Sequence, residues 1–170
     1  GRLAHEGMRL SLNLSPSQFA HGGIADRLVT IAQQFQMPLD LLTVEITETA
    51  LVADESIMRD EITQLRERGV YVLLDDFGTG YSSLSYLSKF PLDELKIDRS
   101  FVNDILTDEH DWLLAKSIIY LCKSLSIPVV AEGVETKAEY HALQDMGIHL
   151  FQGYYFARPS FESLAEVNWD

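Results

Sequence analysis

VLLDDFGTGYSSL, at residues 72–84, places two adjacent carboxylates, Asp75 and Asp76, at the end of an apolar run. An apolar run of this kind predicts a buried strand, where repulsion and desolvation both disfavour paired acids. Taken alone, the pair is typical of an Asp-rich turn. Because adjacent strand residues point to opposite faces, both acids reach one site only if the strand ends between them. Gly78 and Gly80 supply the backbone freedom for that turn.

Similar apolar runs alternate with helical patterns along the whole chain. We expect strands at 8–14, 42–47, 70–75, 94–98, 127–132 and 149–154. Apolar residues recur at helical spacing between them, at Ile24, Leu28, Ile31 and Phe35, at Met58, Ile62 and Leu65, and at Leu114, Ile118, Leu121, Cys122 and Leu125. Thr136 and Glu139 predict a capping box. This order indicates an α/β protein with parallel strands and helical crossovers, in a single domain over residues 1–170.

A polar residue lies in or at the end of nearly every expected strand. These residues are Asn13, Glu45, Asp75, Lys96, Glu132 and Gln152. An open doubly wound sheet gathers its ligand groups near one switch point, whereas a barrel collects them from the carboxyl ends of its strands. Exposed edge strands would explain one or two of the six. We therefore expect a modified TIM (β/α)8 barrel, incomplete with about six β/α units, because a full barrel takes about 250 residues.

Composition narrows the class of protein. A hydrophobic content of 46% with 23% charged residues indicates a globular chain, and a formal charge of -13 argues against binding to polynucleotide. No run approaches the roughly 20 apolar residues of a membrane helix, so we expect no membrane contact by this segment. Gly1 is not an ordinary translation start, so we expect a longer parent. Cys122 is the single cysteine, and its helical spacing predicts a buried apolar role.

The acids of this chain form an oxygen-rich set. Glu45, Asp75, Asp76 and Glu132, with the side-chain carbonyl of Asn13, are ligands of the type that Mg²⁺, Mn²⁺ or Ca²⁺ prefers. A hard cation would also offset the repulsion between neighbouring carboxylates. Lys96 would lower that repulsion further or orient a water. The five histidines show no paired spacing, which disfavours a histidine zinc site.

Six segments in order carry a resemblance to a known family. They are SLNLSPSQF (11–19), VEITE (44–48), DDFGTGYSSL (75–84), LKIDRSF (95–101), AEGVET (131–136) and QGYYFARP (152–159). Through them the chain resembles the EAL-domain family of bacterial cyclic di-GMP phosphodiesterases. The resemblance implies hydrolysis of one phosphodiester of cyclic di-GMP to linear pGpG, with Mg²⁺ or Mn²⁺ as cofactor and Ca²⁺ as inhibitor.

The resemblance also implies roles for individual residues. The implied metal ligands are Asn13, Glu45, Asp75, Asp76 (on a second metal) and Glu132. The implied catalytic residues are Lys96 and Glu132, either of which would activate the attacking water. The implied supporting residues are Glu135 and Gln152, which orient ligands or water, and Glu48, which braces the loop 77–83. Asp98 is assigned to substrate contact. Without the family, Glu48 and Glu135 would be interpreted as solvent-facing charges.

One departure from the family pattern bears on activity. The Glu-Ala-Leu signature and the arginine that follows it are absent from these 170 residues. We therefore expect the N-terminal strands of the barrel to lie outside this sequence, and the isolated chain to be inactive or impaired while its complete parent is active. The alternative is a non-catalytic cyclic di-GMP receptor or dimerisation module. With the resemblance set aside, an enolase-like barrel with Lys96 as base remains.

The resemblance further implies partners and a location. We expect cyclic di-GMP as ligand, a homodimer in the parent, and upstream sensory or GGDEF domains. The expected location is the cytoplasm, although upstream segments would be able to anchor the parent to a membrane.

Overall fold

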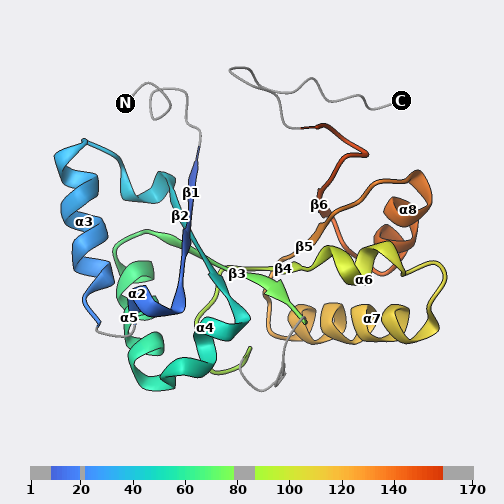
Figure 1. Ribbon diagram of the computed structural model, residues 1–170, viewed down its shortest axis with the longest axis horizontal. Coiled ribbons are helices and arrows are strands. Elements are labelled where there is room, and N and C mark those ends of the chain that lie inside the picture. Colours follow the sequence, from blue (N-terminus) through green and yellow to red (C-terminus); the bar gives the residue numbers. More distant parts are fainter. Residues whose placement is uncertain (1–8, 20–21, 79–86, 159–170) are drawn as a thin grey trace. The chain divides into compact units, whose positions relative to one another are not determined.

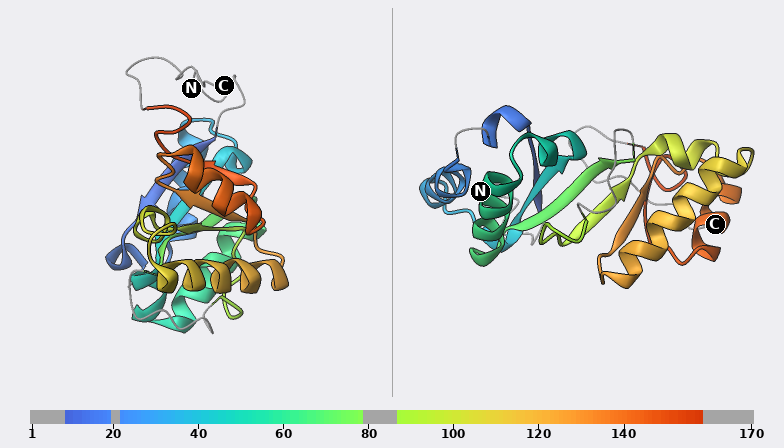
Figure 2. Two further views of the ribbon diagram at one scale, coloured as in Figure 1. Left: turned by 90° about the vertical axis from the view of Figure 1, so that its right-hand side faces the viewer. Right: turned by 90° about the horizontal axis from the view of Figure 1, so that it is seen from below.

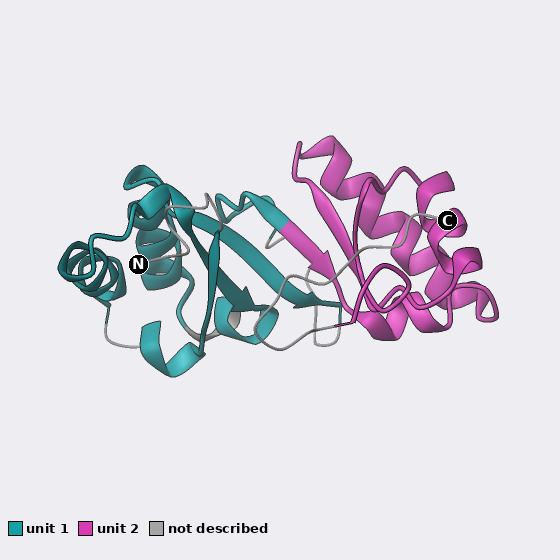
Figure 3. Ribbon diagram, turned by 90° about the horizontal axis from the view of Figure 1, so that it is seen from above, with its two compact units in different colours: residues 1–94 teal, residues 95–170 magenta. Residues whose placement is uncertain are grey.

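A computed structural model describes residues 9–19, 22–78 and 87–158 (Figure 1). The chain divides into two compact units, residues 1–94 and 95–170 (Figure 3). Within the described ranges, no helix combines the length and the apolar character that crossing a membrane requires. The interpretation of residues 1–170 as a single domain stays a prediction, and each unit is described by itself.

The first unit is a parallel three-stranded arrangement with helices between its strands. Its elements are β1 (Leu10–Leu14), α2 (Pro16–Phe19), α3 (Ile24–Gln34), the 3-10 helix η1 (Leu39–Leu41), β2 (Leu42–Thr47), α4 (Glu48–Ala53), α5 (Glu55–Glu67) and β3 (Tyr71–Phe77). β2 pairs in parallel with β1 on one side and with β3 on the other. Helix α5 packs against both α3 and β3 (Figures 1 and 2).

The core of the first unit contains only some of the apolar residues that recur at helical spacing in the sequence. Met58, Ile62 and Leu65 of α5 are buried, as their spacing predicts. Ile31 is instead exposed, because the buried face of α3 consists of Ile24, Ala25, Leu28 and Ala32. Phe35 is also exposed and follows the last residue of the helix, Gln34. The spacing of apolar residues therefore located α3 correctly but overstated the width of its buried face.

A buried carboxylate from α5 caps the start of α3. Glu61 is 5% exposed and accepts hydrogen bonds from the backbone N–H groups of Gly23 and Ala25, the latter at 2.9 Å. Gly23 has a left-handed φ of 75° and supplies no side-chain cap. Because the first N–H groups of a helix lack partners within the helix, Glu61 satisfies donors that would otherwise be orphaned. Its negative charge also complements the helix dipole.

Replacement of Glu61 by alanine is expected to lower the free energy of unfolding by about 1–3 kcal/mol, because the buried N–H of Ala25 and the more exposed N–H of Gly23 lose their acceptor. Glu61→Gln keeps one acceptor oxygen but places its NH2 group against the second backbone N–H, so we expect it to recover only part of this loss. Urea unfolding of the two variants measures both effects. The control is Glu67→Ala, an exposed glutamate on the same helix. A cost for Glu61→Ala equal to that of the control would contradict the capping role.

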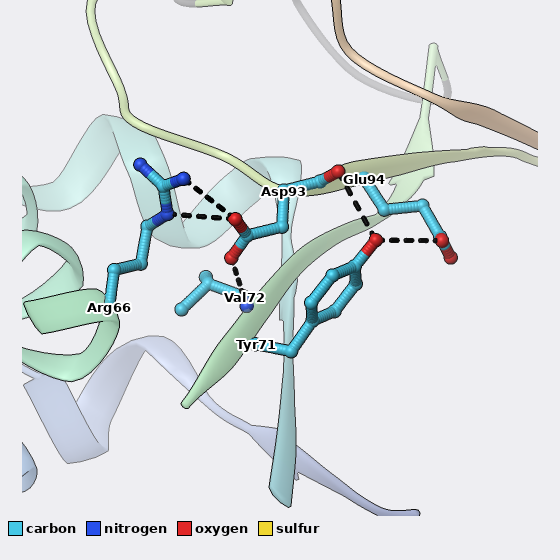
Figure 4. A network of polar contacts seen from close by, with 5 residues as sticks. All are labelled: Arg66, Tyr71, Val72, Asp93 and Glu94. Carbon is cyan, nitrogen blue, oxygen red and sulfur yellow. Dashed lines mark hydrogen bonds and ion pairs between the residues drawn. The ribbon is translucent and has the colours of Figure 1, made fainter. Parts of the chain in front are cut away.

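Asp93, near the end of the first unit, contacts both α5 and β3 (Figure 4). Its Oδ1 accepts hydrogen bonds from Nε and Nη2 of Arg66 at 3.0 and 2.7 Å, and its Oδ2 accepts from the backbone N–H of Val72 at 2.9 Å. The hydroxyl of Tyr71 donates to Oε2 of Glu94 at 3.1 Å. The Arg9 guanidinium lies 4.7 Å from the centre of the Tyr71 ring. These contacts lie at the amino-terminal ends of the strands, where they stabilise the fold.

The environment of Tyr71 predicts an unusual titration. Burial, followed by the charge and hydrogen bond of Glu94, raises the pKa of Tyr71 from 10.0 to about 12. The folded protein therefore keeps the phenol proton at a pH where the unfolded chain loses it. The stabilisation from this group is complete below about pH 10 and is lost as the pH rises towards 12. Subtracting the ultraviolet titration of Tyr71→Phe from that of the wild type isolates this group, and a midpoint near 10 would contradict the expectation.

The second unit repeats the parallel pattern. Its elements are β4 (Glu94–Ile97, whose first residue closes the first unit), α6 (Arg99–Asn103), α7 (Glu109–Ser124), β5 (Val129–Glu132), α8 (Lys137–Asp145) and β6 (Leu150–Gln152). β5 pairs in parallel with β4 and β6. Helix α6 lies beside α7 (Figure 1). Cys122 is fully buried on α7, as predicted, and burial raises the pKa of its thiol to about 12.

The order of elements predicted from the sequence is confirmed. The expected strand 42–47 coincides with β2, and the other expected strands overlap β1, β3, β4, β5 and β6. Residue 8 lies outside the described residues. The predicted capping box is present, because Thr136 accepts from the N–H of Glu139 and Glu139 accepts from the N–H of Thr136. Parallel strands joined by helices establish the α/β class.

Candidate metal and catalytic site

The strand register of the first unit gathers three of the expected metal ligands on one face. Asn13 on β1 is the direct partner of Glu45 on β2. Glu45 is in turn the partner of Leu73, which precedes Asp75 by two residues on β3. Because side chains two residues apart share a face, Asn13, Glu45 and Asp75 project from the same side near the carboxyl ends of the strands. Glu45 is 8% exposed.

Asp75 and Asp76 are brought together by a local change of backbone conformation. β3 continues to Phe77, so the expectation that the strand ends between the two acids is wrong. Asp76 instead adopts a left-handed φ of 54°, and Oδ1 of Asp75 accepts a hydrogen bond from its N–H at 3.0 Å. The left-handed residue interrupts the alternation of faces. As a result, carboxylate oxygens of the two residues lie within 4.8 Å of each other.

Glu48 contacts the chain immediately after this turn. It begins α4, is 4% exposed, and its Oε2 accepts a hydrogen bond from the N–H of Gly78 at 3.1 Å. The solvent-facing interpretation of Glu48 is therefore wrong. Gly78 has a φ of 102°, which fits the turn expected there, whereas Gly80 and the rest of the loop to residue 83 lie outside the described residues. The bracing role of Glu48 for the whole loop stays a prediction.

The second unit pairs the expected catalytic residues. Lys96 Nζ and Glu132 Oε1 lie 3.0 Å apart, and the two side chains are 10% and 20% exposed. The register explains the contact, because Ile97 pairs with Ala131 and thereby sets Lys96 and Glu132 on the same face of neighbouring strands. Gln152 is the direct partner of Glu132 on β6. A cationic and an anionic group are therefore held together at the carboxyl ends of β4 and β5.

Two further predicted residues lie at helix starts. Asp98 is the N-cap of α6, and its Oδ1 accepts from the N–H of Ser100 at 2.9 Å. Glu135 is exposed, in the loop between β5 and α8. The assignment of Asp98 to substrate and the supporting role of Glu135 stay predictions. Glu139, which accepts hydrogen bonds from this loop, and Gly153, which Val134 approaches closely, were not among the expected site residues, although the capping-box spacing includes Glu139.

The donor chemistry of these residues fits a hard divalent cation. Asn13, Glu45, Asp75, Asp76 and Glu132 supply carboxylate and amide oxygens and no sulfur or imidazole. Mg²⁺ and Mn²⁺ prefer such ligands.

Comparison with known families identifies the chain. The family model described as "EAL domain" matches residues 2–159. This chain belongs to the EAL domain family. Among its relatives in Pseudomonas aeruginosa, the cyclic di-GMP phosphodiesterase NbdA is 40% identical over 91% of this chain, and the bifunctional diguanylate cyclase/cyclic di-GMP phosphodiesterase MucR is 38% identical over 91%. The EAL-domain chain spans 20% of NbdA and 23% of MucR, about a fifth to a quarter of their length.

Solved EAL structures share the fold of this chain. The MucR phosphodiesterase in complex with cyclic di-GMP superposes with a TM-score of 0.83, at 38% identity over 91% of this chain and 63% of that one. BlrP1 of Klebsiella pneumoniae, in complex with calcium and cyclic di-GMP, gives 0.87 at 35% identity over 98% of this chain and 42% of that one. BlrP1 is also known in complex with manganese and cyclic di-GMP. The prediction of an incomplete barrel of the EAL type is thereby confirmed.

Proposed function

We propose that the protein containing this chain hydrolyses one phosphodiester of cyclic di-GMP to linear pGpG in bacterial second-messenger signalling. The observation that carries the proposal is the partly buried ion pair of Lys96 and Glu132 at the carboxyl ends of β4 and β5. Membership of the EAL family and the phosphodiesterase relatives NbdA and MucR support it. The proposed activity is that of the whole protein, to which this chain contributes the metal ligands proposed below and both candidate catalytic groups.

The proposed cofactor is Mg²⁺ or Mn²⁺, held by Asn13, Glu45, Asp75, Asp76 and Glu132. When bound, such ions lower the pKa of water and stabilise charge on phosphoryl oxygens. Glu132 then accepts a proton from the attacking water, or Lys96 orients that water through its ammonium group. Glu132 also holds Lys96 in place by their ion pair. Gln152, beside Glu132 in the register, orients it from β6.

The test is hydrolysis by the complete gene product, with pGpG quantified by chromatography. We expect turnover with Mn²⁺, loss of turnover on chelation, recovery on adding Mn²⁺ back, and inhibition by Ca²⁺. The isolated 170-residue chain is expected to be inactive or impaired, because it contains no Glu-Ala-Leu segment. Turnover by the isolated chain equal to that of the complete product would contradict this part. Cyclic di-GMP binding without turnover by the complete product would establish the receptor alternative instead.

The proposal extends to assembly and location. We propose that the parent is a homodimer with sensory or GGDEF domains upstream, and that this segment works in the cytoplasm without membrane contact. MucR, a bifunctional relative, supports the presence of a second catalytic activity in such proteins. Light scattering of the complete gene product measures the oligomeric state, and a monomer at all concentrations would contradict the dimer.

A further inference from the structure

The loop between β5 and α8 is fixed on its β5 side by close backbone contacts. Gly133 has a φ of 74° and lies against α6, where a Cβ would come within 2.4 Å of the Arg99 Cβ. The Val134 N–H donates to the carbonyl of Gln152 at 3.2 Å, and the Val134 carbonyl accepts from the N–H of Tyr155 at 2.9 Å. The residues directly after Glu132 are therefore attached to the end of β6.

The other side of the loop is fixed by one oxygen of Glu139. This residue is 8% exposed on the first turn of α8. Its Oε2 accepts from the N–H of Glu135 at 2.8 Å and from the N–H of Thr136 at 2.9 Å. A capping box requires only the second of these bonds. The bond to Glu135 extends one residue further towards Glu132 and has no role in capping the helix.

We propose that Glu139 is a positioning residue of the candidate site. Its carboxylate fixes the loop backbone at Glu135, so that Glu132, three residues earlier, keeps its place beside Lys96. Hydrogen bonds to an ionised acceptor are shorter and stronger than neutral ones, and burial of Glu139 protects them from competing water. The catalytic consequence rests on the proposed function, whereas the structural consequence does not.

The capping box offers a matched control. Thr136→Ala removes the reciprocal bond, in which Thr136 Oγ1 accepts from the N–H of Glu139 at 3.2 Å, and keeps both bonds from the loop to Oε2. Glu139→Ala removes both loop bonds. Both variants weaken the N-terminus of α8. A loss of Mn²⁺ affinity or kcat that is caused only by lower helix stability would therefore appear in both variants. Glu139→Gln retains an oxygen that is able to accept both loop N–H groups.

Three measurements on the complete gene product test the proposal. Amide hydrogen exchange at Glu135 is expected to accelerate in Glu139→Ala and to stay unchanged in Thr136→Ala. Mn²⁺ affinity, measured by electron paramagnetic resonance with the metal alone, is expected to fall about 10–100-fold in Glu139→Ala, the usual effect of losing a group that orients a ligand. kcat for cyclic di-GMP is expected to fall with KM unchanged. Glu139→Gln is expected to recover most of each loss.

Two results would overturn the proposal. The first is equal loss of Mn²⁺ affinity and kcat in Thr136→Ala and Glu139→Ala, which would show that only helix stability matters. The second is unchanged amide exchange at Glu135 in Glu139→Ala. If the wild-type protein binds Mn²⁺ and shows the expected exchange pattern but hydrolyses no cyclic di-GMP, the proposed function fails while the positioning role stands.

Discussion

Glu132→Gln in the complete gene product is expected to lower kcat for cyclic di-GMP about 10²–10⁴-fold, the usual contribution of a positioned acid or base. The amide nearly preserves the volume of the side chain but neither accepts a proton nor supplies a negative charge to a cation. It also removes the charge that lies 3.0 Å from Lys96 Nζ. Steady-state kinetics with Mn²⁺ measures the loss, and urea unfolding shows whether the variant remains folded.

The control for this substitution is Glu109→Gln, an exposed glutamate on the first turn of α7. Its kcat is expected to match the wild type. Lys96→Met tests the partner side chain and is expected to impair turnover as well, because the ammonium group can no longer orient water. Wild-type kcat in Glu132→Gln would exclude Glu132 from the chemistry and leave Lys96 as the candidate for activating water.

Gly153→Ala is expected to destabilise the chain by about 3 kcal/mol, at the upper end of the range for overpacking. A Cβ at this position would lie 2.1 Å from the Val134 carbonyl oxygen and 2.4 Å from the Val134 nitrogen. Both are backbone atoms, so the contact cannot be relieved by a change of side-chain rotamer. The contact must therefore be relieved by moving the loop after Glu132 away from β6, which also breaks the bond from Val134 N–H to the Gln152 carbonyl.

Gly147→Ala provides the matched control in the same unit. Gly147 has a φ of 97°, and no atom lies within 4 Å of the position that a Cβ would take, so alanine there meets backbone strain without a clash. We expect a cost of about 1–2 kcal/mol from the left-handed conformation alone. The φ of Gly153 lies outside that region, so its larger cost is steric. Urea unfolding that ranks Gly147→Ala as the more damaging change would contradict the role of the close approach.

Local sequence patterns were sufficient for the elements and for the type of site. The apolar run at 42–47 predicted both ends of β2 correctly, because helical segments before and after it leave little choice of where the strand begins and ends. The placement of Lys96 and Glu132 at strand ends likewise predicted that both lie at the same edge, since parallel strands present their carboxyl ends to one edge, and the structure adds their direct contact. The prediction about Asp75 and Asp76 was wrong in detail, because Asp tolerates a left-handed φ but its presence in the sequence does not show where the backbone adopts one.

Local patterns along the chain were therefore enough to predict the α/β class, the order of the elements, and the acids, amide and lysine that give the chain its EAL character. The contacts that support these groups became visible only in the folded chain. Glu61 caps a helix whose N-cap residue lies 38 positions before it, Glu139 reaches past its own capping box to Glu135, and Gly153 admits the backbone of Val134. The supports at Glu61 and Gly153 depend on partners far away along the chain, which packing brings close and which no local sequence pattern specifies. The bond from Glu135 to Glu139 is local, but the capping-box pattern predicts only the bond at Thr136.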